Sequence, residues 1–357
     1  MRFLLAGGGT AGHVNPLLAL AQQLRAEGHE VFALGTKEGL EQRLVPERGF
    51  ELFTVRKLPL PRKLSLNALG FPFLLLLESL RTLRLIRRLK VDAVVGFGGY
   101  ASPPAYLGGW LARKPMVVHE ANAIAGFANR LGAKLGGKVA IAFPNANIRG
   151  ELTGMPIRSE IIDSLSVYDK GQARVELGLD PMLPTLLVTG GSLGAKSINE
   201  TIINSLEVLK AAGIQVLHIV GDRAGLEEVS EPGYRRMAYC LRMDAAIAAS
   251  DLAVSRAGAS TVSEFSVAGL PAIYIPYPVG NGEQRLNAVT VVEAGGGEIV
   301  LDKDFSPEYV SKKVIPILSH ASTLKKMSQA ARSVGIEDAT ARLRDLVLGS
   351  VNTRADD

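Results

Sequence analysis

Short apolar segments alternate along the chain with segments in which apolar residues recur at helical spacing. The apolar runs are rich in β-branched residues and lack polar alternation, which predicts strands buried on both faces. The intervening stretches, such as Leu17–Arg25 and Ile198–Leu209, have the spacing of amphipathic helices. Strands separated by helices indicate parallel sheets with both faces covered, an α/β fold. The predicted strands are Phe3–Ala6, Val31–Leu34, Ala93–Val95, Met116–Val118, Thr185–Val188, Val216–Val220, Leu252–Val254 and Ala272–Ile275.

One part of this pattern occurs twice. The first copy begins at Phe3 and reads FLLAGGGTAGHVNPLLALAQQL; the second begins at Thr185 and reads TLLVTGGSLGAKSINETIINSL. Each is an apolar strand, a glycine pair with Ser or Thr, and an amphipathic helix. The repeat predicts two Rossmann-like domains, each a doubly wound parallel sheet. We expect them at 1–157 and 158–337, with the last residues, about 338–357, packing back on the first.

Composition supports two globular domains. The chain has 357 residues, of which 47% are hydrophobic and 21% charged, and this excludes a disordered or fibrous protein. The single cysteine, Cys240, cannot form an internal disulfide and favours a reducing compartment. The apolar run at the start is too short for a signal peptide, and no apolar stretch approaches the roughly 20 residues that span a bilayer. We therefore expect a cytoplasmic location.

The basic charge is concentrated in one region. Residues 56–90 contain nine basic residues and one acidic residue, a net charge of +8, whereas the whole chain carries +5. This predicts one anionic partner at one place. Residues 58–90 have an apolar face at helical spacing, which suits either a helix packed on the first domain or docking on an anionic membrane surface. Only Phe71 and Phe73 supply aromatic rings there, so nucleic acid is disfavoured as a partner.

Three glycine-rich turns follow predicted strands, where open α/β sheets bind their ligands. The turn at 7–12 matches G-x-G-x-x-G, but Gly35-Thr36 after the second strand lacks the acid that a dinucleotide site requires. Glycines there serve either phosphate binding at a helix N-terminus or only tight packing of strand and helix. The other turns lie at 96–100 and 190–194. We expect the two sheets to face each other across a cleft that holds a nucleotide and a second phosphorylated substrate.

Six motifs, in order along nearly the whole chain, identify a resemblance. They are GGGTAGHVNP at Gly7, GFGGYASPP at Gly96, HEANAIAG at His119, GGSLGA at Gly190, SRAGASTVSE at Ser255 and GEQRLNA at Gly282. Together they closely resemble the undecaprenyldiphospho-muramoylpentapeptide N-acetylglucosaminyltransferases of bacterial cell-wall synthesis.

The resemblance implies an inverting GT-B glycosyltransferase that uses no metal or cofactor. It would move GlcNAc from UDP-GlcNAc to the polyprenyl-diphosphate-linked muramoyl-pentapeptide, lipid I, and so make lipid II. The first domain would bind the acceptor and the cytoplasmic face of the membrane as a peripheral protein, and the second would bind UDP-GlcNAc. Two rival functions stay open: a GT-B enzyme with another lipid or small-molecule acceptor, and a non-catalytic nucleotide-sugar-binding protein.

His13 is the candidate catalytic residue. It lies at the start of the helix after the first glycine turn, where the helix N-terminus disfavours the imidazolium and suits a base. A histidine there can also simply bond a loop carbonyl. The resemblance favours the base, or a residue essential to attack by the acceptor.

The remaining site residues follow from the resemblance. Thr261 and Glu264 match a helix capping box, whereas the resemblance assigns Glu264 to the ribose of UDP. The expected UDP-GlcNAc contacts are Thr10, Ala11, Gly12, Asn122, Arg158, Ser192, Ala259, Ser260, Thr261, Glu264 and Gln284. The expected acceptor-diphosphate loops contain Gly8, Gly9, Gly98, Gly99 and Tyr100.

The chain departs from the family pattern at three positions, Met155, Cys240 and Glu283, and Glu283 puts the recognition of sugar hydroxyls in doubt. The D-x-D pattern at Asp302–Asp304 resembles a metal site of other glycosyltransferases. Ser306 and Pro307 follow it as a helix entry, which favours a structural interpretation. No His/Cys cluster has zinc spacing, so we expect no metal.

Overall fold

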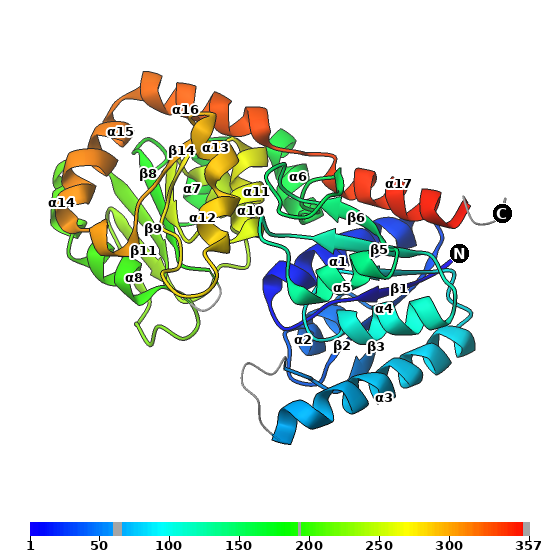
Figure 1. The fold of residues 1–357 in the computed structure, drawn as a ribbon. Coiled ribbons are helices and arrows are strands. Elements are labelled where there is room, and N and C mark those ends of the chain that lie inside the picture. Colours follow the sequence, from blue (N-terminus) through cyan, green and yellow to red (C-terminus); the bar gives the residue numbers. More distant parts are fainter. Residues whose placement is uncertain (60–65, 192–193, 353–357) are drawn as a thin grey trace. The chain divides into compact units, whose positions relative to one another are not determined.

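The computed structural model describes residues 1–59, 66–191 and 194–352 and divides into two compact units (Figure 1). Unit 1 contains residues 1–158 and the C-terminal segment from Asp338, and unit 2 contains Ser159–Glu337. The division follows Arg158, one residue after the expected boundary. Each unit is built on a seven-stranded sheet, which confirms the predicted pair of parallel-sheet α/β domains.

The sheet of unit 1 is parallel throughout and has the strand order β3-β2-β1-β4-β5-β6-β7. Leu4 and Leu5 on the central strand β1 contact different apolar clusters on the two faces of the sheet. The sequence lacks polar alternation because helices cover both faces. The strands are β1 (Arg2–Ala6), β2 (Glu30–Thr36), β3 (Glu51–Val55), β4 (Ala93–Gly96), β5 (Met116–Glu120), β6 (Lys138–Ile141) and β7 (Glu151–Leu152).

Helices from both ends of the chain cover this sheet. α17 packs beside α1 although more than 300 residues separate them (Figure 1). Its Leu343 and Val347 are buried in the same cluster as Phe3 and Leu5 of β1. On the other face, α3 packs against α4. The helices are α1 (Ala11–Ala26), α2 (Glu41–Glu47), α3 (Leu66–Arg88), α4 (Ser102–Leu111), α5 (Phe127–Lys134) and α17 (Ala339–Asn352).

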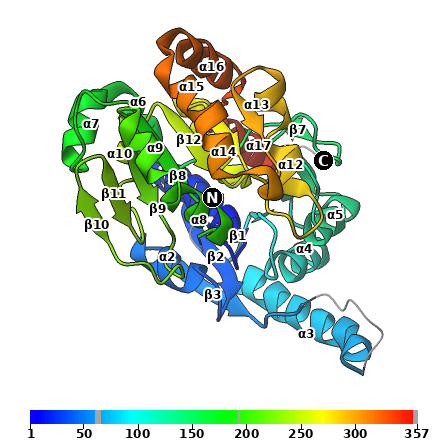
Figure 2. The same cartoon turned by 90° about the vertical axis from the view of Figure 1, so that its left-hand side faces the viewer.

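The sheet of unit 2 has the order β10-β11-β9-β8-β12-β13-β14 and is parallel except that β10 runs antiparallel to β11. The β10–β11 hairpin forms one edge (Figure 2). The strands are β8 (Thr185–Thr189), β9 (Gln215–Ile219), β10 (Val229–Glu231), β11 (Tyr234–Met237), β12 (Leu252–Ser255), β13 (Ala272–Tyr274) and β14 (Gly297–Ile299).

Short helices connect these strands. The α-helices are α6 (Ser159–Val167), α7 (Lys170–Glu176), α8 (Lys196–Ile203), α9 (Leu206–Ala211), α10 (Met243–Ala249), α11 (Ala259–Ala268), α12 (Glu283–Asn287), α13 (Val289–Glu293), α14 (Pro307–Tyr309), α15 (Ile315–Ser319) and α16 (Ala321–Val334). A 3₁₀-helix, η1 (Asp302–Asp304), precedes α14, and a π-helical turn, η2 (Val310–Val314), follows it.

The helix expected at Ile198–Leu209 is wrong as a single element. The structure has two helices, α8 and α9, which are separated at Asn204 and Ser205. The Ser205 hydroxyl donates to the Thr201 carbonyl at 2.7 Å, and the Ser205 N–H bonds the Ile202 carbonyl three residues back. This local pairing breaks the helix, while the apolar spacing continues across the break because both helices cover the same face.

Truncating Leu343 tests whether α17 is part of the core of unit 1. Leu343→Ala should lower the free energy of unfolding of this unit by about 3 kcal/mol, because it leaves a cavity under a fully buried side chain. Urea denaturation measures the change. Leu241→Ala, at a side chain that is 86% exposed, is the matched control and should shift the midpoint little. Equal effects of the two variants would contradict the packing of α17.

Candidate active site

The first glycine turn joins β1 to α1 at the carboxyl edge of the sheet. Gly9 has φ +89°, and Gly9 and Thr10 are exposed, whereas Ala11 and Gly12 in the first turn of α1 are half-buried. Thr10 is the N-cap residue, but its side chain makes no capping hydrogen bond. The first N–H groups of α1 are therefore not capped by a side chain, and a helix start of this kind favours anions.

His13 lies in this first turn with its ring fixed. Nδ1 is 3.0 Å from the Gly8 carbonyl oxygen and 3.4 Å from the Thr10 hydroxyl. A carbonyl can only accept a hydrogen bond, so Nδ1 carries the proton and Nε2 of the neutral ring holds a free lone pair. Of the alternatives for His13, the bond to a loop carbonyl is present, and it leaves Nε2 in the form that a base requires.

The second glycine turn, after β4, lies directly against the first. Gly98 and Gly99 have φ +92° and +75°, which only glycine adopts without strain. A Cβ on Gly98 would lie 3.1 Å from His13 Nε2, and a Cβ on Gly99 would lie 2.5 Å from the Gly8 oxygen. Ser102 fixes the turn by accepting from the Gly98 N–H at 3.0 Å. The structure thus brings the expected residues of both turns together, with the half-buried Tyr100 beside them.

Glu41, which the sequence analysis missed, stands behind the first turn. It is the first residue of α2 and is fully buried. Its carboxylate accepts hydrogen bonds from the Gly9 N–H, the Thr36 N–H and the Thr36 hydroxyl, each at 2.8 Å. A dinucleotide site would have an acid immediately after β2, and the sequence has none there; Glu41 lies five residues after Thr36. The sequence feature that could have identified Glu41 is an acid at a helix start, two residues after Gly39.

The loop that carries Asn122 is held by a buried carboxylate. Glu120, at the end of β5, accepts from the Asn122 N–H at 2.9 Å, the Gly126 N–H at 3.0 Å and the Asn129 amide at 2.9 Å. The neighbouring His119 is buried, and its Nε2 is 3.1 Å from the Gly154 carbonyl. Burial lowers the pKa of His119 to about 4. It is therefore neutral near pH 7, in a structural position.

In unit 2, the β12–α11 junction and the helix that follows carry four of the expected donor contacts. Helix α11 begins at Ala259 after the N-cap residue Gly258, so Ala259, Ser260 and Thr261 form its first turn. The capping-box interpretation of Thr261 is wrong, because the helix begins at Ala259, so that Thr261 lies inside its first turn, and no side chain caps it. Glu264 lies in the helix interior and is only 6% exposed. Ser260 Oγ is buried and has no hydrogen-bond partner among the described residues.

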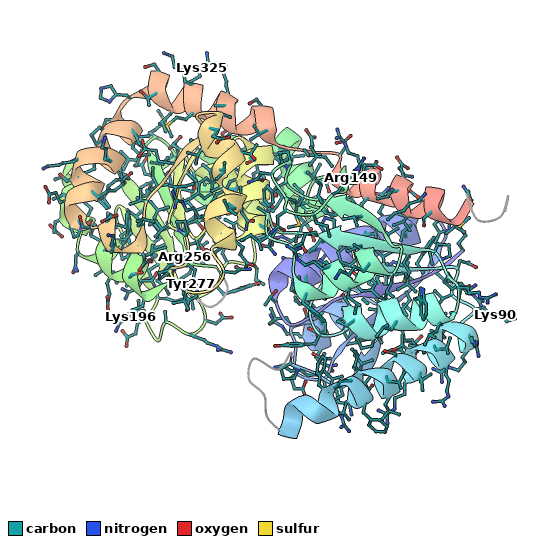
Figure 3. The ribbon with its side chains drawn as sticks, viewed as in Figure 1. Lys90, Arg149, Lys196, Arg256, Tyr277 and Lys325 are labelled. Atoms are coloured by element: carbon teal, nitrogen blue, oxygen red, sulfur yellow. The ribbon has the colours of Figure 1, made fainter. Side chains whose placement is uncertain are left out.

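Arg256 ties the loops of this edge together (Figure 3). Its buried guanidinium forms an ion pair with Asp302 and donates to Ser197 Oγ at 3.1 Å and to the Ile275 carbonyl at 3.2 Å. The guanidinium also lies over the Tyr277 ring, 5.6 Å from its centroid. These contacts join β12, the start of α8, the loop after β13 and η1. The sequence analysis missed Arg256 as an organising residue, although it stands inside a recognised motif.

Three further expected donor contacts remain: Gln284, Ser192 and Arg158. Gln284 Oε1 accepts from the Tyr277 N–H at 2.9 Å, so this side chain anchors its own loop. In the turn after β8, Gly191 and Gly194 have φ +82° and +78°, and the following helix α8 has no side-chain cap. Ser192 lies outside the described residues. Arg158 is a half-buried residue at the end of unit 1.

Two family models match the chain. The glycosyltransferase family 28 N-terminal domain matches residues 3–141, and the family 28 C-terminal domain matches residues 185–343. A relative from Clavibacter sepedonicus is 52% identical, over 99% of this chain and 97% of its own length. The chain belongs to glycosyltransferase family 28. The relative is named UDP-N-acetylglucosamine–N-acetylmuramyl-(pentapeptide) pyrophosphoryl-undecaprenol N-acetylglucosamine transferase.

Further relatives agree with this assignment. A Streptomyces coelicolor protein of the same name is 46% identical, over 99% of this chain and all of its own length. Among solved structures, MurG of Acinetobacter baumannii aligns with a TM-score of 0.78 at 29% identity, covering 98% of this chain and 99% of that one. CalG4, the calicheamicin glycosyltransferase, aligns with a TM-score of 0.69 at 16% identity over 99% of each chain, a likeness of fold alone. The fold is GT-B.

The D-x-D pattern of this family 28 enzyme is a structural element. Asp302 is held by Arg256 and by the Ser197 hydroxyl at 2.9 Å, and η1 carries the pattern. Ser306 caps the next helix by accepting from the Tyr309 N–H, with Pro307 at the first position. Within residues 1–59, 66–191 and 194–352, no three His, Cys, Asp or Glu side chains are grouped so that they could hold a metal ion.

The three departures differ in their setting. Met155 is 2% exposed and Cys240 is 6% exposed, so both side chains are buried. Glu283 is the first residue of α12, and its N–H bonds the Asn281 side chain at 3.2 Å.

Neutralising Asp302 tests the Arg256 network. Asp302→Asn should lower the free energy of unfolding by about 2 kcal/mol, because it leaves a buried guanidinium without its carboxylate. Asp304→Asn, two residues away at an exposed position of the same η1 turn, is the control. Thermal unfolding of both variants measures the difference. Equal melting temperatures for the two would show that the ion pair does not hold this edge.

Proposed function

We propose that this glycosyltransferase moves GlcNAc from UDP-GlcNAc to N-acetylmuramyl-(pentapeptide) pyrophosphoryl-undecaprenol, lipid I, and so makes lipid II for peptidoglycan. The main support is identity of 43–52% with relatives of that name over nearly the whole chain. The turn geometry agrees, since both units present glycine turns and uncapped helix starts at the carboxyl ends of their strands.

The ribose and the diphosphate of the donor are assigned to unit 2. Glu264 would bind the ribose hydroxyls, because a carboxylate can accept from two of them at once. The start of α11, with the unpartnered Ser260 hydroxyl, and the turn containing Ser192 would bind the diphosphate. Gln284 keeps its NH₂ group for a sugar hydroxyl while its oxygen holds the Tyr277 N–H. Ala259 and Thr261 complete the proposed donor contacts of unit 2, and the proposal adds Thr10, Ala11, Gly12, Asn122 and Arg158 of unit 1.

The acceptor is assigned to unit 1. Its diphosphate would lie on the turns at Gly8–Gly9 and Gly98–Tyr100, and His13 Nε2 would take the proton of the attacking hydroxyl. That oxygen forms a bond to the anomeric carbon of GlcNAc while the bond to the UDP oxygen breaks, which inverts the configuration. The N-termini of α8 and α11 would stabilise the charge that grows on departing UDP.

Helix α3 is the proposed membrane contact, which would make the protein peripheral on the cytoplasmic face. Phe73 and Leu76 are 70% and 52% exposed, and Arg84, Arg87 and Arg88 on the same helix are exposed as well. Exposed apolar and basic side chains on one helix are typical of binding to an anionic interface. Part of the 58–90 segment, residues 60–65, lies outside the described residues. No helix in the described ranges is long and apolar enough to cross a membrane.

Release of UDP from UDP-GlcNAc, measured with and without a lipid I analogue, tests the reaction. Wild-type protein should release UDP only with the acceptor. His13→Ala should lower kcat by about 100-fold or more and still bind UDP-GlcNAc, because only the base is lost. His320→Ala, at an exposed histidine of unit 2, is the control. Donor binding without acceptor-dependent release would contradict the assigned acceptor and favour another acceptor or a non-catalytic binding protein.

Flotation with phosphatidylglycerol-containing vesicles tests the membrane contact. Reversing two charges, with Arg84→Glu and Arg87→Glu together, should weaken binding by at least about tenfold, since each basic residue contributes on the order of 1 kcal/mol at an anionic surface. Lys325→Glu with Lys326→Glu, on the exposed side of α16, is the matched control in unit 2. Equal weakening by both pairs would locate the effect in overall charge rather than in α3.

A further inference from the structure

The peptide group between Gly8 and Gly9 is hydrogen-bonded at both of its ends. Its N–H, from Gly9, donates to Glu41 Oε2 at 2.8 Å. Its carbonyl, from Gly8, accepts from His13 Nδ1 at 3.0 Å. A carboxylate, one backbone amide and an imidazole therefore form a continuous hydrogen-bonded chain that ends at the free lone pair of His13 Nε2.

The backbone around Glu41 is shaped to this carboxylate. A Cβ on Gly8, Gly35 or Gly39 would collide with the Glu41 side chain, so three glycines make the space that it fills. Its other oxygen accepts from the Thr36 N–H and hydroxyl. Among the described residues, no Lys or Arg forms an ion pair with it. The carboxylate is held by two N–H groups and one O–H group, and one of these N–H groups belongs to the peptide that holds His13.

We propose that Glu41 is a positioning residue that acts through the Gly8–Gly9 peptide to fix the tautomer of His13 and raise the basicity of its Nε2. A carboxylate at the N–H end polarises the amide, which makes the Gly8 oxygen a stronger acceptor for the Nδ1 proton. The same field stabilises the imidazolium that forms when Nε2 takes the proton of the acceptor hydroxyl. No proton crosses the amide. This inference rests on the proposed role of His13 as the base.

Other groups near His13 do not supply this effect. Gly98 presents only backbone to Nε2, and Asn129 of α5 is neutral. Of the titratable side chains on β5, His119 is neutral near pH 7, since burial lowers its pKa to about 4. Glu120 accepts from Asn122, Gly126 and Asn129, and none of these groups is the partner of the His13 ring. Thr10 contributes a hydroxyl at 3.4 Å. Glu41 is the charged group joined to His13 through a single amide.

The pH dependence of transfer by Glu41→Gln tests the proposal. The variant keeps the size of the side chain and removes the charge. We expect kcat at the optimum to fall by about tenfold, with KM for UDP-GlcNAc nearly unchanged. In the pH profile of kcat/KM, we also expect the acid limb to move to lower pH, because a less basic His13 ring loses its proton at lower pH. Glu41→Asp keeps the charge and should return the limb toward that of the wild type.

The control is Glu47→Gln, the same substitution at an exposed acid of the same helix α2, which should leave both the rate and the limb unchanged. A purely structural Glu41 would lower kcat without moving the limb, and that result would overturn the proposal, as would an unchanged kcat.

Nitrogen NMR of the wild-type protein labelled at its histidine rings gives a second readout that needs neither turnover nor a stable variant. It should show His13 protonated at Nδ1 in the neutral form, and an Nε2–H tautomer would refute the proposal. Wild-type protein with this tautomer but without acceptor-dependent UDP release would instead refute the proposed function.

Discussion

The site of unit 1 depends on the close approach of two backbone segments, the Gly8 carbonyl after β1 and Gly99 after β4. A Cβ on Gly99 would lie 2.5 Å from the Gly8 oxygen, so the two turns can meet only through glycine. Adjacent parallel strands bring their carboxyl ends to one edge, and the glycines let the backbones approach. The Gly8 oxygen is thereby held where it also accepts from His13 Nδ1. The same packing leaves the uncapped start of α1 beside the ring.

In unit 2, the loops at the carboxyl edge of the sheet are held together by a charged side chain, that of Arg256. The turn after β8 also needs glycine, since a Cβ on Gly194 would collide with the Val220 carbonyl. The loops after β12 and β13 are joined by Arg256, which reaches carbonyls, a hydroxyl and Asp302 at once. A planar guanidinium with five donors can satisfy several loops together, which a lysine could not. The repeated strand–turn–helix pattern is therefore stabilised by backbone contact in one unit and by an arginine in the other.

The sequence was most informative where a function depends on local pattern. Glycine turns after apolar strands predicted the carboxyl edges, and His13 followed from its place at a helix start. It was least informative where one residue acts across the fold. Glu41 reads as an ordinary acid at a helix start, because nothing local shows that the Gly9 N–H points at it. The capping box at Thr261 was wrong for the opposite reason. The common local pattern is present, but the helix already begins at Ala259, after the N-cap residue Gly258.

The sequence by itself determined the two α/β domains, the position of their glycine turns and, through motif resemblance, the family. Apolar periodicity and turn chemistry are short-range properties, so they can be read without knowing which segments meet. Only the tertiary structure decided that Asp302 pairs with Arg256 and that Glu41 is linked to His13 through one peptide group. These are contacts between residues far apart in the chain or between side chain and backbone. Their energy depends on distance and burial, which residue order does not specify.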